Sequence, residues 1–496
     1  MNRSKKLKIN TVSGLCGQIV TLICGFIVPK LILNTYGSDV NGLVSSITRF
    51  LSFISLAECG VGAVVQSALY KPLAEKDYYK VSKIIISSER FFRKVGMILI
   101  IYIGVLIALY PSIINNRYSF FYTASLIIAI SISSYVQYFF CMSYRLLLTA
   151  DQVGYIQTSL QIITIILNTI FCVILSRAGA SIQTFKLVTS LIFLLQPLGL
   201  AFYVKKNYKI NKKIKFTDEP ISQKWNGLSQ HVAYVVLENT DTVVLTLLSS
   251  LSNVSIYNVY FLVVNGIKCM INVVISGAQS FFGNMYAKDE KDELVNAFSI
   301  YEWSIHTVVT FLFTCTAILI VPFVKIYTYG ITDANYIDPL FGNLMALAQA
   351  MYCLRIPYNS IVFAAGHYKQ TQISALIEAL INIIVSVVLV FKYGIIGVAI
   401  GTFIAISYRT VYLVFYLKKN IIMRPIKHFI RYIVVDIVII SISYLLTINL
   451  EMNELSYVSW FILGIKVAII VATITFLVNF LLYNKLIRVL LSNIKN

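Results

Sequence analysis

The stretch GMILIIYIGVLIALYPSIIN, residues 96–115, has no charged side chain and is long enough to cross a lipid bilayer as one helix. The connections between such stretches are mostly short, which leaves no room for a separate soluble domain. The pattern predicts an all-α polytopic membrane protein with fourteen transmembrane helices. The other apolar stretches of spanning length lie near residues 10–34, 42–70, 119–148, 154–176, 181–204, 225–250, 255–286, 301–328, 338–365, 370–391, 395–417, 429–449 and 457–484.

The composition of the whole chain supports this prediction. Of its 496 residues, 58% are hydrophobic and only 12% are charged, and the mean hydropathy is +0.79. A soluble domain of this length could not bury so much apolar surface. The function is therefore to be sought inside the membrane.

Lysine and arginine are distributed unevenly between alternate connections. Short translocated loops tolerate these residues poorly, so the basic connections are expected in the cytoplasm. This predicts a multi-pass protein of the bacterial cytoplasmic membrane with both termini inside, and no cleavable signal peptide, because the first apolar run continues as a full span. The basic connections fall near residues 3–8, 71–94, 205–224, 418–431 and 485–495, whereas the opposite set holds Arg117, Arg177, Lys392, Asp39, Asp333, Asp338, Glu451 and Glu454.

The basic loops fit topology and contact with anionic membrane lipids better than nucleic acid, for which no binding fold is present. The eight cysteines are scattered through the spans without a CxxC motif, and the four histidines lack metal-ligand spacing. No cofactor and no metal beyond a coupling Na⁺ is expected. No catalytic constellation is present either, so the chain is not expected to be an enzyme.

Features of the first half recur about 214 residues later. Gln66-Ser67 and Ala74-Glu75-Lys76-Asp77 match Gln279-Ser280 and Ala287-Lys288-Asp289-Glu290, and Arg177-Ala178-Gly179 matches Lys392-Tyr393-Gly394. Six spans separate the copies, so both copies share one orientation, which predicts two parallel lobes facing a central cavity. We expect an N-terminal six-helix lobe at 1–204, a cytoplasmic linker at 205–222, a C-terminal six-helix lobe at 223–418 and an additional helix pair at 427–484.

Cations dominate the charged residues within the spans. An ionisable group near the middle of a bilayer costs at least about 2.5–3.5 kcal/mol, so it normally faces a cavity or a partner. A cavity with several cations favours an anionic substrate, and guanidinium groups suit phosphate. Lys30, Arg145 and Lys186 lie nearer the span ends, where snorkelling to the interface is the simpler interpretation. The substrate-binding candidates are Arg49, Lys268, Arg355, Arg409 and Lys30.

Acidic and polar residues of the second half predict a coupling-ion site. Asp241, Asn382 and Thr402 all fall roughly 18–20 Å from the cytoplasmic face at about 1.5 Å per residue. Oxygen ligands at one depth could hold Na⁺, or Asp241 could carry a proton. Glu378 and Glu238 are neighbouring candidates. The alternative is that Glu238 or Asp241 pairs with Lys268, and an ion pair between Asp436 and Lys466 is expected in the additional helices.

At this point the chain resembles a known family. The 6+6+2 plan and the matching ends of the second and eighth spans resemble the oligosaccharide-lipid flippases of capsule and O-antigen pathways. These belong to the superfamily that also holds multidrug and toxin extrusion transporters and the lipid II flippase. The segment from Ala57-Glu58-Cys59-Gly60 to Leu73-Ala74-Glu75-Lys76 is similar to part of the lipid II flippase's second helix. The resemblance implies a sodium site on helices 7, 11 and 12, matched here by Asp241, Glu378, Asn382 and Thr402.

The predicted function is therefore transport for polysaccharide biosynthesis. The substrate would be an undecaprenyl-pyrophosphate-linked oligosaccharide repeat unit, moved by alternating access coupled to Na⁺ or H⁺. A polysaccharide polymerase and glycosyltransferases of the same pathway are the expected partners. A multidrug or cation antiporter of the same fold is an alternative, but it would need a cavity lined by carboxylates. A membrane polysaccharide polymerase or glycosyltransferase is another, but the outer loops are too short and lack paired acids.

Overall fold

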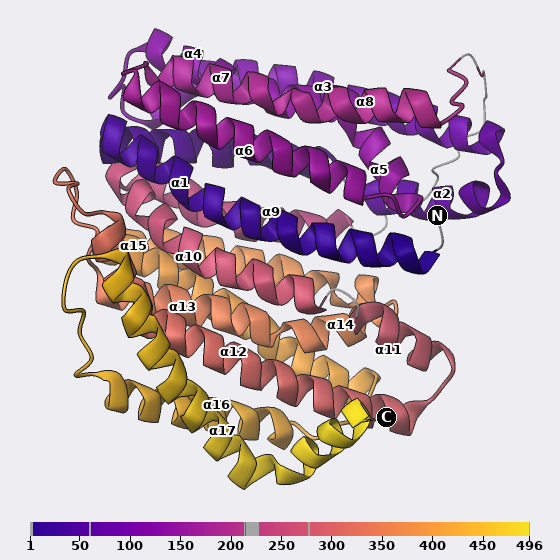
Figure 1. Cartoon of the computed structure of the whole chain (residues 1–496), viewed down its shortest axis with the longest axis vertical. Coiled ribbons are helices and arrows are strands. Elements are labelled where there is room, and N and C mark those ends of the chain that lie inside the picture. Colours follow the sequence, from indigo (N-terminus) through magenta and orange to yellow (C-terminus); the bar gives the residue numbers. More distant parts are fainter. Residues whose placement is uncertain (1–2, 59–60, 213, 215–227, 276–277, 496) are drawn as a thin grey trace. The chain divides into compact units, whose positions relative to one another are not determined.

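The computed structural model describes residues 3–58, 61–212, 214, 228–275 and 278–495, so most of the expected linker lies outside the described residues. The described part of the chain is helical and contains no strand (Figure 1). Ten of its helices are long and apolar enough to cross a membrane. The chain divides into two compact units, Met1–Ser255 and Ile256–Asn496. This confirms the predicted all-α polytopic membrane fold.

The helices of the first unit begin and end close to the expected spans. They are α1 (Arg3–Ser52), η1 (Phe53–Glu58), α2 (Val61–Glu75), α3 (Tyr78–Ile113), α4 (Phe120–Val136), the π-helical turn η2 (Gln137–Cys141), α5 (Met142–Ala150), α6 (Tyr155–Arg177), α7 (Ile182–Phe193), α8 (Leu195–Asn207) and α9 (Leu228–Leu248).

The second unit holds most of α10, which begins at the end of the first, and all later helices. They are α10 (Leu251–Ile275), α11 (Ala278–Ala287), α12 (Lys291–Tyr327), α13 (Pro339–Leu354), α14 (Ile356–Ala364), α15 (Tyr368–Asn420), α16 (Lys427–Thr447) and α17 (Tyr457–Lys495).

Two of these helices each contain two of the expected spans. α1 bends at Gly37, where φ is 83°, and α15 bends at Gly394, where φ is 54°. A side chain is strained at such positive φ values, whereas glycine adopts them readily. Each glycine therefore lets one span turn directly into the next without a loop.

Left-handed residues recur with the spacing of the repeat. Lys76 and Asp289 lie 213 residues apart, Gln152 and Gly366 lie 214 apart, and Gly179 and Gly394 lie 215 apart; all have positive φ. The turns themselves also match. Asp77 N donates to Pro72 O as Glu290 N donates to Met285 O, and Val153 N donates to Leu148 O as His367 N donates to Val362 O. Equivalent helix ends thus adopt equivalent turns, which supports the duplication; the axis relating the copies stays a prediction.

Buried apolar side chains hold the first unit together in two clusters. One surrounds the bend of α1 and includes Leu43, Ile47 and Phe185, and the other joins α2, α3 and α5. α1 packs closely along α6, and α9 packs against α1. Helix α9 therefore belongs to the same compact unit as α1, although the repeat assigns its sequence to the second lobe.

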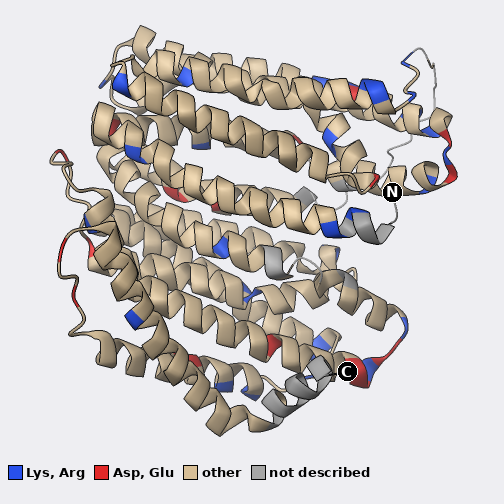
Figure 2. Ribbon diagram, in the orientation of Figure 1, with Lys and Arg blue, Asp and Glu red and all other residues tan. Residues whose placement is uncertain are grey.

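One end of the first unit is rich in basic residues (Figure 2). The start of α1, the α5–α6 turn and the chain after α8 meet there, because Lys6 and Tyr208 both contact Asp151. Asp77 caps α3 at this end, and the backbone N–H of Lys80 lowers the pKa of its carboxyl group. The opposite end holds the Asp39–Arg117 ion pair and the bend at Gly37. This sidedness is the one expected from the sequence.

The additional helices α16 and α17 attach to α12 through buried polar contacts. His306 Nδ1 lies 2.6 Å from Asp436 Oδ2, and Thr310 Oγ1 donates to Asp436 Oδ1 at 2.7 Å. Trp303 Nε1 donates to Asn479 Oδ1 of α17 at 2.7 Å. These bonds satisfy polar groups that would be costly to expose to lipid tails.

Candidate functional site

The second unit contains a buried cluster of two arginines around one glutamate. Glu378 is 1% exposed and accepts hydrogen bonds from both guanidinium groups. Its Oε1 accepts from Arg355 Nη1, and its Oε2 accepts from Arg409 Nη1 at 2.8 Å. Arg355 and Arg409 are themselves 3% and 6% exposed. Two candidate substrate residues and one candidate ion-site residue thus form a single cluster.

Interrupted helices place these three side chains. α13 ends at Leu354 and α14 begins at Ile356, so Arg355 occupies the break between them. Pro357 cannot donate its backbone nitrogen to the preceding turn, which explains an interruption here. Glu378 and Arg409 lie on the two halves of α15, on either side of the bend at Gly394. The cluster therefore ties the broken helix to both halves of α15.

A third cation lies close to this cluster. Lys268 Nζ is 4.9 Å from the centre of the Tyr352 ring, and the Arg355 guanidinium carbon is 4.7 Å from the centre of the same ring. The faces of aromatic rings attract cations. The Lys268 side chain is 5% exposed. Lys268, Arg355 and Arg409 thus gather around Glu378, and we use the name arginine cluster for Tyr352 and these four residues.

The remaining substrate candidates lie on α1 of the first unit. Arg49 Nη1 donates to the backbone oxygen of Glu238 on α9 at 3.5 Å. Lys30 is partly exposed in the span before the bend. These two residues are not part of the arginine cluster, which is formed entirely within the second unit.

The five coupling-ion candidates are divided between the two units. Asp241, which is 3% exposed, and Glu238 lie on α9 in the first unit. In the second unit, Asn382 Nδ2 donates to Thr402 Oγ1 at 3.0 Å across the bend of α15. The second unit therefore brings together two of the candidates by a direct bond, whereas Glu378 binds the arginines. Their role in ion binding stays a prediction.

Two further acids have partners other than those expected. Asp436 binds His306 and Thr310, and Lys466 is exposed, so the predicted Asp436–Lys466 pair is wrong. The prediction matched the depths of two residues in neighbouring helices but did not include His306 of α12. In the first unit, Glu58 accepts a hydrogen bond from Tyr138 at 2.5 Å. No cluster of three or more metal-ligating side chains occurs among the described residues.

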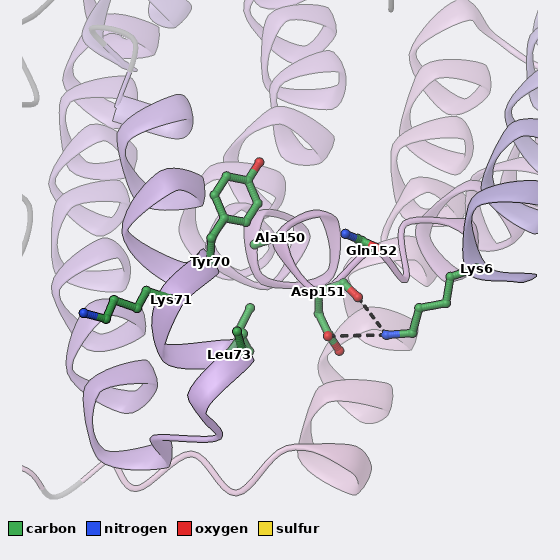
Figure 3. Close-up of a pocket in the computed structure, with 8 residues that line it drawn as sticks. Lys6, Tyr70, Lys71, Leu73, Ala150, Asp151 and Gln152 are labelled. Atoms are coloured by element: carbon green, nitrogen blue, oxygen red, sulfur yellow. Dashed lines mark hydrogen bonds and ion pairs between the residues drawn. The ribbon is translucent and has the colours of Figure 1, made fainter. Parts of the chain in front are cut away.

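A cavity of about 580 Å³ opens at the basic end of the first unit (Figure 3). Lys6 points toward the α5–α6 turn and binds Asp151 through both its side chain and its backbone oxygen. Lys71 extends away from Asp151. Burial and the Asp151 carboxylate raise the pKa of Tyr208, which donates to Asp151. Because its acid is already bound, this cavity fastens the N-terminus and offers basic groups to the membrane surface.

Comparison with known proteins gives the fold. No family model matches the chain, and no curated protein matches its sequence. A solved structure of the lipid II flippase MurJ in an inward closed conformation is similar with a TM-score of 0.72 and 17% identity, covering 96% of this chain and 99% of that one. Inward- and outward-facing structures of a MATE multidrug transporter of the MOP superfamily give TM-scores of 0.61 and 0.60, each at 14% identity. They cover 82% and 83% of this chain, and 97% and 94% of theirs. The chain therefore has the fold of these MOP-superfamily transporters.

Proposed function

We propose that the chain is a flippase for a polyprenyl-pyrophosphate-linked oligosaccharide. It would move the repeat unit of a capsule or O-antigen from the inner to the outer leaflet of the bacterial cytoplasmic membrane, with both termini in the cytoplasm. The lipid tail would stay in the bilayer while the sugar and pyrophosphate pass through the protein.

The arginine cluster carries this proposal. Two guanidinium groups share one carboxylate, and Lys268 lies against the same aromatic ring as Arg355. The positive charge in the cluster exceeds the negative charge of its single acid. Positive charge within a membrane protein favours an anionic ligand, and guanidinium groups bind phosphate in a planar fork. A cationic drug would be repelled by the same groups.

The fold comparison supports a lipid-linked substrate. The match to the lipid II flippase spans nearly the whole of both chains, including a larger share of this chain than the multidrug transporters match. A fold alone does not specify a substrate. The excess of buried cations adds the chemical argument for a pyrophosphate.

The proposal is tested by flipping in proteoliposomes. A polyprenyl-pyrophosphate oligosaccharide is placed in the outer leaflet, and its loss from attack by an added glycosidase is followed with time. Arg409→Gln should slow flipping at least about tenfold, as expected for losing a charge-assisted bond. Arg409→Lys should restore part of the rate, because it keeps the charge but not the fork. Arg177→Gln, at the exposed end of α6, is the matched control.

The outcomes separate the candidate functions. Unchanged flipping by Arg409→Gln would remove the arginine cluster from the mechanism. No flipping by the wild-type protein, with exchange of a cationic dye instead, would replace the flippase by a cation antiporter of this fold.

Asp241 is proposed to bind the coupling ion, Na⁺ or H⁺. A membrane potential is worth about 2.3 kcal/mol per charge per 100 mV, which is enough to bias one conformation over another. Asp241→Asn should make flipping insensitive to a Na⁺ gradient and to pH while substrate binding persists. If the variant and the wild type respond alike to both gradients, Asp241 has no part in coupling.

A further inference from the structure

The first unit contains a polar cavity that is separate from the arginine cluster. Its volume is about 290 Å³, and it lies among α4, η2, α5, α6 and α8. Five polar side chains line it, in a region where most neighbouring positions are apolar: Ser133, Gln137, Arg145, Gln161 and Gln196. We call it the glutamine cavity.

Two helix interruptions create this cavity. The π-helical turn Gln137–Cys141 separates α4 from α5, and α7 ends at Phe193 while α8 begins at Leu195. Pro197, two residues into α8, also lines the cavity. Single π-helical turns widen a helix locally and occur frequently at functional sites. The space is therefore built by the backbone at a place where two spans are irregular together.

The polar side chains that line the cavity lack partners within the protein. Among the described residues, the side chains of Gln137, Gln161 and Gln196 form no hydrogen bond, and that of Arg145 forms no ion pair. Gln196 is 8% exposed, so its amide is almost wholly enclosed and lines the cavity. Buried amides normally find a hydrogen-bond partner. Their missing partners point to an occupant.

The charges around the cavity select the kind of occupant. Arg145 supplies a permanent positive charge, and no acid lines the cavity. The acid on η1, Glu58, accepts a hydrogen bond from Tyr138 of η2. A guanidinium group without a carboxylate partner favours an anionic ligand.

The amides and the size narrow the choice further. A carboxamide both donates and accepts hydrogen bonds, and three of them around one space match a ligand with several hydroxyl groups. Phe193 and Pro197 supply apolar surface for the carbon face of a ring. A volume of 290 Å³ lies at the small end of ligand pockets and equals roughly ten water molecules. That space suits one monosaccharide, not a whole oligosaccharide.

We propose that the glutamine cavity binds a single acidic sugar, in which Arg145 holds the carboxylate and the glutamines hold the hydroxyl groups. This inference rests on the proposed function, and it adds that the oligosaccharide contains an acidic residue. The site lies inside the first unit and is distinct from the proposed pyrophosphate contacts of the second.

The test measures binding of glucuronate to the purified, detergent-solubilised protein by saturation-transfer NMR and calorimetry. We expect saturable binding, and binding of glucose at least about tenfold weaker, because glucose keeps the ring but lacks the charge. Arg145→Gln should weaken glucuronate binding about tenfold or more, and Gln196→Leu should weaken it severalfold. Arg145→Lys should be intermediate. Arg177→Gln should bind as the wild type does.

Two further results would overturn the inference. Glycerol phosphate bound as tightly as glucuronate would indicate a lipid headgroup site. An absence of saturable binding, or equal binding by Arg145→Gln, Gln196→Leu and the wild type, would mean that the cavity holds only water. Flipping in proteoliposomes without glucuronate binding would reject this inference and leave the proposed function standing. Glucuronate binding without flipping would do the reverse.

Discussion

The two halves of the chain interrupt the same helix and use the interruption differently. In the first half the π-helical turn Gln137–Cys141 precedes α5, and in the second half α14 follows the break at Arg355, 214 residues after Cys141. Both interruptions bring an arginine into the bundle. Arg355 finds a carboxylate, whereas Arg145 faces amides and empty volume.

This difference distinguishes structural from ligand-binding roles for a buried cation. A buried charge must be paired or it is costly, and Glu378 supplies that pairing inside the second unit. The glutamine cavity has the cation but no acid, so the compensating charge must come from outside the protein. The same repeat can therefore carry a fastened cluster in one copy and an open site in the other.

Removing the shared carboxylate should have the largest effect on stability. Glu378→Gln leaves Arg355 and Arg409 close together without a counter-charge, and breaking a buried pair costs about 3–5 kcal/mol. The free energy of unfolding is measured by titrating the detergent-solubilised protein with SDS. Glu454→Gln, in the exposed loop before α17, is the control and should change little. An equal stability for the two variants would mean that Glu378 does not organise the cluster.

The attachment of the additional helices should come next. Asp436→Asn weakens the bonds to His306 and Thr310, and a hydrogen bond to a charged group contributes about 1.5–3 kcal/mol. We expect a loss in this range by the same titration, with faster proteolysis of the loop between α16 and α17. A variant as resistant as the wild type on both measurements would assign no anchoring role to Asp436.

The matched turns of the two halves give a smaller effect. Gly366 and Gln152 occupy equivalent left-handed positions. Gly366→Ala should cost about 1–2 kcal/mol, because an L-residue is strained at this φ. Gly104→Ala, in α3 with open space around the new methyl group, should be neutral or slightly stabilising. A similar change in both variants would contradict the argument from φ.

The membrane fold could be predicted because it depends on local chemistry. Runs of apolar residues and the basic connections set the spans and their sidedness before any tertiary contact is known. The two sharp bends were anticipated as boundaries between spans 10–34 and 42–70 and between 370–391 and 395–417, and the structure places Gly37 and Gly394 there.

The site was predicted only in part, because its pairings depend on packing between helices. Arg355, Arg409 and Lys268 were identified as buried cations, but depth along a span could not show that Glu378 lies between the two arginines. The same limit produced the wrong partner for Asp436. Gln137, Gln161 and Gln196 were overlooked, although a polar amide inside an apolar span is a signal that charge counting ignores.

The smallest effect on stability should come from Arg145→Gln, and it sharpens the contrast between the two arginine environments. Arg145 has no ion-pair partner among the described residues, so its loss leaves no carboxylate unpaired. We expect a change in unfolding free energy within about 1 kcal/mol, of either sign, because removing an uncompensated buried charge offsets lost packing of its methylene groups. The titration used for Glu378→Gln measures it, and glucuronate binding is measured on the same sample. Stability kept while binding is lost would mark Arg145 as a ligand group. A loss as large as that of Glu378→Gln would show that both halves use the arginine to hold the helices together.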